Sequence, residues 1–179
     1  MIYSIGHGNK DIRRFIEELK AFNVQFLIDV RTKPYSKFWP HFDRERLKTS
    51  LLNNSVKYLF LGDKLGGLPD DPSCYRDGLV DYDRLKSSTQ FLNGIDRLVT
   101  ADQKELNVAV MCSESKPEEC HRSKAIGEVL AERNIVMVHI LSEDSSKDQG
   151  TVMNELTGGK AGTDLFGNEP SFTSRKKYR

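Results

Sequence analysis

The sequence from Val108 to Arg133 constrains the fold more than any other part of the chain. It begins with an apolar run, 108–111, of strand length and too short for a helix of its own. Pro117 and the acids that follow it predict a helix start, because proline is tolerated in a first turn and carboxylates favour the positive helix end. The next residues keep one helical face apolar. A strand, a polar loop and a helix in this order place the loop at the sheet edge where ligands usually bind.

The same alternation of apolar runs and amphipathic segments continues along the chain. Strands are predicted at 2–5, 25–31, 56–61, 108–111 and 136–141. Helices are predicted between and after them, at 11–22, 43–54, 82–99 and 117–133. We therefore expect a single α/β domain, residues 1–142, with about five mainly parallel strands and helices on both faces.

The periodicity fades after this domain. Residues 143–179 are predicted to form an extended or partly disordered arm, with Leu165 and Phe166 as its apolar docking pair. The arm ends in a basic cluster that offers nucleic acid a contact, formed by Arg175, Lys176, Lys177 and Arg179.

Composition narrows the class of protein. The chain has 179 residues, 30% of them charged, and a net charge of +1, which argues against nucleic-acid binding driven by overall charge. It shows neither an apolar run of membrane-spanning length nor a signal peptide, so we expect no membrane partner. Three cysteines in a chain too long to need disulfide staples predict a reducing, cytoplasmic setting.

Cys112 closes the predicted strand and is the candidate nucleophile. A thiolate needs a lowered pKa, which helix N-terminal dipoles and nearby cations supply. Lys116, His121 and Arg122 are the cations within reach, and Glu114 opposes them. The alternative is a small, unreactive buried thiol at the sheet edge.

Cys120 stands at the start of the predicted helix, where the dipole favours a thiolate. Three roles are open: it resolves Cys112 as a disulfide, it binds a metal with Cys112, His121 and His7, or it packs under the loop. Zinc sites normally use tight pairs such as C-x2-C, whereas this chain has C-x7-C-H. We therefore expect no metal and no cofactor.

Residues after the other strands complete the predicted site. His7 lies between two glycines, which predicts a tight turn. Three roles are open for it: a general base near Cys112, a donor to an anionic ligand, or a structural histidine. Asp29 and Arg31 share one strand face, either to hold an anion or as a buried structural pair. Further substrate contacts are predicted in the loops, at Ser36, Gly66, Gly67, Glu114, Cys120 and His121.

Five segments in order carry a family resemblance. IYSIGHGN, LIDVRTKPYS, YLFLGDKLGG, VAVMCSESKPEECHRSKAI and VHIL resemble the bacterial family known as domain of unknown function 488, over roughly Ile2 to Leu141. LIDVR, together with a strand, a cysteine, a loop and Arg122-Ser123, is also similar to the rhodanese fold. That second resemblance implies a sulfur-carrying Cys112. We therefore expect the sheet to be either Rossmann-like or rhodanese-like.

These features predict a cysteine-dependent enzyme in which Cys112, helped by His7 and Arg122, transfers or hydrolyses a sulfur, acyl or phosphoryl group. The substrate would be a small anion or a nucleotide. The alternative is a non-catalytic module that binds a nucleotide, phosphate or nucleic acid through His7, Arg31 and Arg122.

Overall fold

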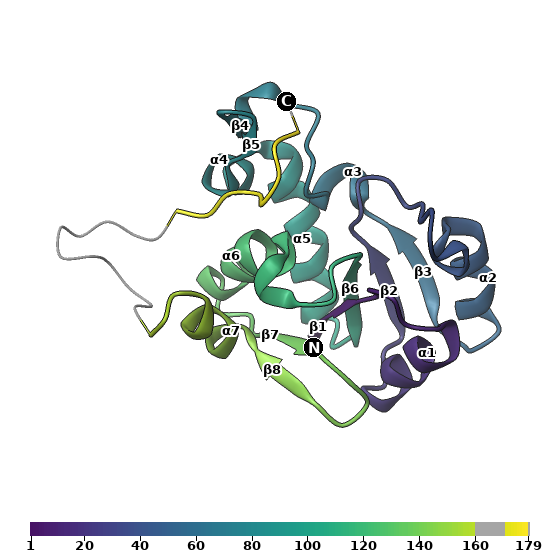
Figure 1. Ribbon diagram of the computed structural model, residues 1–179. Helices are drawn as coiled ribbons and strands as arrows, with labels where there is room; N and C mark the ends of the chain where they lie inside the picture. Colours follow the sequence, from purple (N-terminus) through teal and green to yellow (C-terminus); the bar gives the residue numbers. More distant parts are fainter. Residues whose placement is uncertain (160–170, 179) are drawn as a thin grey trace.

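A six-stranded sheet forms the centre of the computed structural model, which describes residues 1–159 and 171–178 (Figure 1). The strand order is β3-β2-β6-β1-β7-β8, and every pair is parallel except β7 with β8. The bounds are β1 Ile2–Gly6, β2 Phe26–Asp29, β3 Lys57–Phe60, β6 Val108–Cys112, β7 Met137–Ile140 and β8 Ser146–Asp148. The predicted α/β fold with a mainly parallel sheet is confirmed.

β6 and β1 lie at the middle of the sheet and run in register. Ile2 pairs with Val108 at one end and Gly6 pairs with Cys112 at the other. All five residues of β6 are buried, which agrees with a near-continuous apolar run covered on both faces. The register places the polar residues that follow both strands at the same carboxyl edge.

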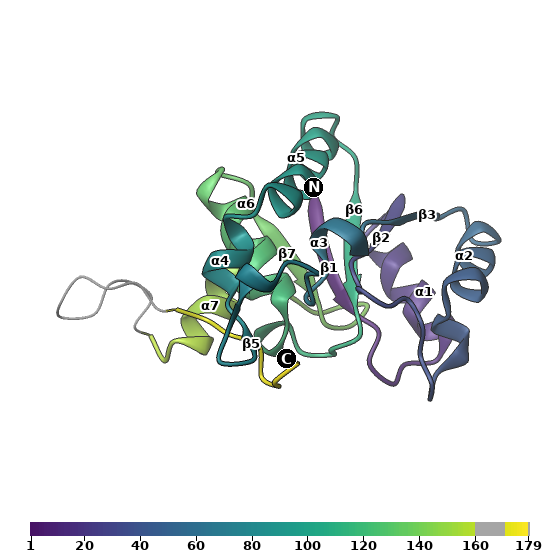
Figure 2. The ribbon, with the colours of Figure 1, turned by 90° about the horizontal axis from the view of Figure 1, so that it is seen from above.

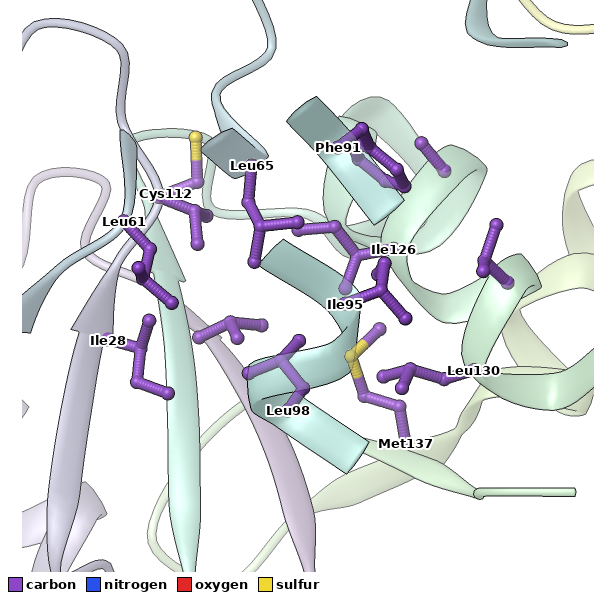
Figure 3. Close-up of a cluster of buried hydrophobic side chains, with 14 of the residues drawn as sticks. Ile28, Leu61, Leu65, Phe91, Ile95, Leu98, Cys112, Ile126, Leu130 and Met137 are labelled. Atoms are coloured by element: carbon purple, nitrogen blue, oxygen red, sulfur yellow. The ribbon is translucent and has the colours of Figure 1, made fainter. Parts of the chain in front are cut away.

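Helices cover both faces of the sheet. On one face, α1 (Ile12–Ala21) and α2 (Arg44–Leu52) pack over a cluster centred on Phe15, Leu47 and Met111. On the other face, a larger cluster lies beneath α3 (Gly62–Leu65), α4 (Tyr82–Lys86), α5 (Thr89–Gln103) and α6 (Glu128–Glu132). Figure 3 shows Cys112 at the border of this larger cluster, with its sulfur directed away from the labelled apolar side chains.

Two predicted helices differ in the structure. The segment 82–99 is broken into α4 and α5 because the Ser88 hydroxyl caps α5, accepting a hydrogen bond from the Phe91 amide. The predicted helix start at Pro117 is a single 3-10 turn, Pro117–Glu119, followed by extended backbone at Cys120. The helix proper begins as a π-helical segment, Arg122–Gly127, and continues as α6.

The predicted arm begins later than residue 143. Residues 146–156 form β8 and α7 (Gln149–Leu156), and Val152 of α7 is buried. β8 was missed because Ser146, Lys147 and Asp148 have no apolar alternation, and the strand forms through backbone pairing with β7. The predicted docking pair Leu165-Phe166 lies outside the described residues.

The C-terminal segment, defined here as residues 171–178, packs beside α4 and a small hairpin (Figures 1 and 2). The hairpin pairs β4 (Tyr75–Arg76) with β5 (Leu79–Val80) after a 3-10 turn, Pro72–Cys74. Backbone bonds join Ser174 to Val80 at 2.9 Å and Tyr178 to Gly78 at 2.8 Å. Within the described residues, no helix has the length and apolar character needed to cross a membrane.

Candidate functional site

The predicted loop after β6 folds over the carboxyl edge of the sheet. Cys112 is the last residue of β6, and the polypeptide returns to the same place at Cys120 through the 3-10 turn. Cys120 is extended (φ −118°, ψ 151°), whereas His121 is already helical (φ −62°, ψ −15°). This change of backbone conformation lets two adjacent side chains point to the same spot.

Four side chains meet there and form what we call the cysteine cluster: Cys112, Glu114, Cys120 and His121. The Cys112 thiol donates to Glu114 Oε2 at 2.9 Å, and the Cys120 sulfur lies 3.5 Å from the same oxygen. The His121 Nδ1 atom lies 3.9 Å from the Cys112 sulfur and 3.6 Å from the Cys120 sulfur. Cys112, Cys120 and His121 are each no more than 5% exposed, so these groups interact with little contact with bulk water.

Arg122 holds the cluster to the sheet. Its side chain is 1% exposed, and its Nε donates to the Cys120 sulfur at 3.2 Å. Its two terminal nitrogens donate to the Ser4 hydroxyl at 3.2 Å and to the Glu114 carbonyl at 2.6 Å. A buried guanidinium with this set of acceptors places a fixed positive charge beside one thiol.

His121 is held in one orientation by the backbone of another element. Its Nε2 lies 3.0 Å from the Leu65 carbonyl oxygen, which can only accept, so Nε2 carries a hydrogen. The other nitrogen, Nδ1, therefore faces the sulfurs. Gly67 makes this possible, because a Cβ atom there would lie 2.8 Å from Nδ1.

We expect Gly67→Ala to destabilise the fold by about 1–3 kcal/mol, because the added methyl group overpacks against a ring that the Leu65 carbonyl holds in place. Urea unfolding checks this value. Gly150→Ala in α7 is the matched control, since its nearest neighbour would be one carboxylate oxygen at 3.2 Å, and we expect a change within about 1 kcal/mol. Equal effects of the two substitutions would contradict the packing role of Gly67.

The electrostatics of the cluster separate the two thiols. A hydrogen bond with Cys120 and burial raise the pKa of Cys112 well above its ordinary value. Burial opposes ionisation of Cys120 as well, but the Cys112 bond and the charges of Arg122 and His121 outweigh it and lower its pKa well below the ordinary value. Cys120 is therefore the thiol of the pair that ionises first, whereas the sequence pointed to Cys112.

The cluster opens into a cavity of about 250 Å³, which we call the cysteine cavity. Both sulfurs line it, and positive side chains from distant parts of the chain surround them. The lining residues that carry charge are Arg31, Lys33, Glu114, Glu119, His121, Arg175 and Lys176. A larger hollow of about 1180 Å³ shares Thr32 and Leu68 with it, but that hollow lies beside the hairpin and contains neither Cys112 nor Cys120.

The predicted anion-binding residue Arg31 reaches this cavity, and Asp29 holds it there. The two side chains form a buried bidentate pair, with contacts of 2.9 and 2.6 Å, and Arg31 also donates to the Phe42 carbonyl at 2.8 Å. Tyr58 donates its hydroxyl to Asp29 at 2.8 Å. Asp29 is therefore a positioning residue, and part of the Arg31 guanidinium is already occupied.

His7 lies on the opposite face of the sheet from the cysteine cluster. Its ring stacks on Phe42 at a centroid distance of 4.2 Å, and its nitrogens contact the Gly8 carbonyl and Arg31. Burial and the Arg31 charge lower the pKa of His7 to about 4. His7 is not among the residues that line the cysteine cavity, although its partner Arg31 is, so its role as a base for Cys112 stays a prediction.

Two other predicted contacts, Ser36 and Gly66, are not among the residues that line the cavity. The Ser36 amide donates to Asp43 at 2.8 Å and its hydroxyl accepts from the Trp39 amide at 3.2 Å, which shapes the loop before α2. Gly66 allows close packing, because a Cβ atom there would lie 2.3 Å from the Gly62 carbonyl oxygen.

The sequence reasoning missed several residues of the site. Ser4 bonds Arg122, and it was visible as a polar residue inside the apolar run of β1. Ser174 and Tyr178 line the cavity, but no local pattern marked them as parts of it.

Comparison with protein-family models gives one assignment. The model described as "Domain of unknown function DUF488" matches residues 11–130, which include all four residues of the cysteine cluster and Arg122. The chain belongs to this family. A search of curated proteins and a search of solved structures return no match. The resemblance of this DUF488 chain to rhodanese domains remains a prediction.

Proposed function

We propose that this DUF488 protein is a cysteine-dependent enzyme that transfers or hydrolyses a group on a small anionic substrate. The observation that carries the proposal is the Arg122 Nε contact of 3.2 Å to the Cys120 sulfur, at the wall of a cavity with several cations. A thiolate paired with a buried guanidinium and open to a cavity is the arrangement of a reactive cysteine.

The reaction would begin with attack of the Cys120 sulfur on the electrophilic atom of the substrate. A bond forms between sulfur and that atom, and the bond to the leaving group breaks with its electron pair. The Cys112 thiol, whose sulfur also lines the cavity, supplies the proton for the leaving group. Water or an acceptor then displaces the group from Cys120, and the proton released returns to Cys112.

The positively charged residues that line the cavity are the reason why we propose an anionic substrate. Arg31 and Lys33 line the cavity from the loop after β2 and Lys176 lines it from the C-terminal segment, so a negative group entering it meets positive charge from two separate parts of the chain. Glu114 lies against the sulfurs themselves, where it would repel an anion that entered too deeply. The anionic part of the substrate would therefore lie toward the lysines, with its reacting atom toward Cys120.

Paired alkylating agents test this proposal in reduced, chelator-treated protein. Iodoacetate is an anion and iodoacetamide is neutral, so the ratio of their rates at one cysteine reports the local charge. We expect Cys120 to react at neutral pH at least about tenfold faster than Cys74, and to prefer iodoacetate more strongly than Cys74 does. Peptide mass spectrometry reads all three cysteines in the same sample.

The variants Cys120→Ser and Cys74→Ser extend the test to turnover of aryl phosphates, sulfates, carboxylates and thiosulfonates. Any activity found should be lost in Cys120→Ser and kept in Cys74→Ser, since Cys74 belongs to the same apolar cluster but lies in the 3-10 turn before the hairpin and is not among the residues that line the cysteine cavity. Cysteines that are all inert until denaturation would overturn the proposal.

The basic C-terminal segment favours a second candidate, a non-catalytic module that binds a nucleotide, phosphate or nucleic-acid end. Arg175 and Lys176 line the cavity, although Arg175 also pairs with Glu119 at 2.8 Å. This candidate predicts salt-sensitive binding that Arg31→Ala or Lys176→Ala weakens and Cys120→Ser leaves nearly unchanged.

A further inference from the structure

Three metal-ligating atoms converge within the cysteine cluster. The Cys112 sulfur, the Cys120 sulfur and a nitrogen of His121 all lie within 4.8 Å of one another. The two sulfur-to-nitrogen separations are 3.9 and 3.6 Å. Ligands bound tetrahedrally to zinc, at about 2.0–2.3 Å from the ion, are separated from each other by roughly 3.4–3.8 Å.

We propose that Cys112, Cys120 and His121 bind a zinc ion whose fourth coordination position opens into the cysteine cavity. This goes beyond the proposed function, which requires only a thiolate. The C-x7-C-H spacing argued against a metal, but the backbone change between Cys120 and His121 makes neighbouring residues converge as a tight pair of ligands would. His7, grouped with these residues from the sequence, is not among the three.

The donor atoms select the class of metal. Two thiolates and an imidazole are soft to intermediate ligands, which suit zinc and the related ions cobalt and cadmium rather than magnesium or calcium. The charge also fits, because two thiolates neutralise a divalent ion. Arg122 then remains as a hydrogen-bond donor to the Cys120 sulfur.

The surroundings hold the ligands as a metal site requires. The His121 Nε2 hydrogen donates to the Leu65 carbonyl, the bond that typically orients a metal-binding histidine and leaves its other nitrogen for the ion. Glu114 Oε2 contacts both sulfurs, at 2.9 and 3.5 Å, so a carboxylate lies beside the proposed ion. Three protein ligands and one open position are the pattern of zinc sites that bind a substrate or water.

Zinc and the nucleophilic thiolate exclude each other at this cluster. An ion bound to the Cys120 sulfur takes up the lone pair with which the sulfur would attack a substrate. The metal-free protein is therefore the alkylation-sensitive form, and the zinc-bound protein is the protected form.

Cobalt substitution tests the site without relying on activity. We expect the reduced apoprotein to take up one Co²⁺ per chain and to show the near-ultraviolet charge-transfer absorption of thiolate–cobalt bonds. Cys120→Ser and His121→Ala should weaken binding at least about tenfold, in line with loss of a ligand. Cys74→Ser is the matched control and should bind cobalt as the wild type does.

A second measurement uses the wild-type protein and does not depend on the folding of any variant. Added Zn²⁺ should slow alkylation of Cys112 and Cys120 but not of Cys74, and a chelator should restore it. If Co²⁺ gives no thiolate absorption and Zn²⁺ protects no cysteine, the metal proposal is wrong. That result would not decide the proposed function, because the reactivity of Cys120 is measured in metal-free protein.

Discussion

Replacing Arg122 by Met should destabilise the protein by about 3–5 kcal/mol, the usual cost of removing one partner from a buried charged network. The guanidinium is 1% exposed and donates to the Cys120 sulfur, the Ser4 hydroxyl and the Glu114 carbonyl. Methionine fills much of the same volume but donates no hydrogen bond, so all three acceptors lose a partner without access to water. Urea unfolding measured with the metal-free protein gives the free energy directly.

Arg133→Met is the matched control for this substitution. Arg133 is the C-cap residue that follows α6, and it pairs with Asp96 at an exposed position, where an ion pair is worth at most about 1 kcal/mol. A loss of stability in Arg122→Met that is no larger than in Arg133→Met would show that the buried network does not support the fold.

Acid should unfold this protein through two buried histidines. Burial, helped by nearby positive charge, lowers the pKa of both His7 and His139 from 6.5 to about 4. Between these values the unfolded chain binds protons that the folded chain does not, so stability falls as the pH falls from about 6.5 to 4. The shift corresponds to about 3 kcal/mol for each histidine.

His139 shows why the folded state resists protonation. Its Nε2 hydrogen donates to Gln149 Oε1 at 2.8 Å, and its Nδ1 accepts from the Ser4 hydroxyl at 2.6 Å. The neutral ring therefore has both nitrogens satisfied, and a second hydrogen would displace the Ser4 bond. Arg122, bonded to the same Ser4 hydroxyl, adds positive charge nearby.

Urea unfolding at pH 7 and at pH 4.5 measures this effect. We expect His139→Gln to lose less stability between the two values than the wild type does, since one of the titrating groups is gone. An unchanged pH dependence in His139→Gln would contradict the assignment.

The parallel sheet could be predicted because its inner strands are apolar on both faces. β6 is the clearest case, since every residue from Val108 to Cys112 is buried. The same property hides which face each side chain takes. Val110 and Cys112 face the larger cluster, whereas Ile5, before His7 on the neighbouring strand, faces the smaller one. The sequence therefore placed His7 correctly at the carboxyl edge of the sheet. It could not show that the His7 side chain lies on the face covered by the smaller cluster, against Phe42.

The sequence predicted where the candidate site lies in the fold, but not which chemical role each of its residues has. Residue order located Cys112, Cys120, His121 and Arg122 at one turn, but the hydrogen bonds decide their roles. Only the structure shows that Arg122 points to Cys120 and that Leu65, more than fifty residues earlier, orients His121. The contribution of Ser174 to Tyr178 to the cavity is a long-range contact for which the sequence has no local signal.

Met1 and the C-terminal segment differ as points of attachment for a bead, a surface or a dye, because they lie at different distances from the cysteine cavity. The amino group of Met1 bonds the Leu106 carbonyl, beside the start of β1 and at the far end of that strand from the cysteines. The C-terminal segment instead forms part of the cavity wall. A linker joined there would leave beside the cysteine cavity, whereas a linker at Met1 would leave at the opposite edge of the sheet.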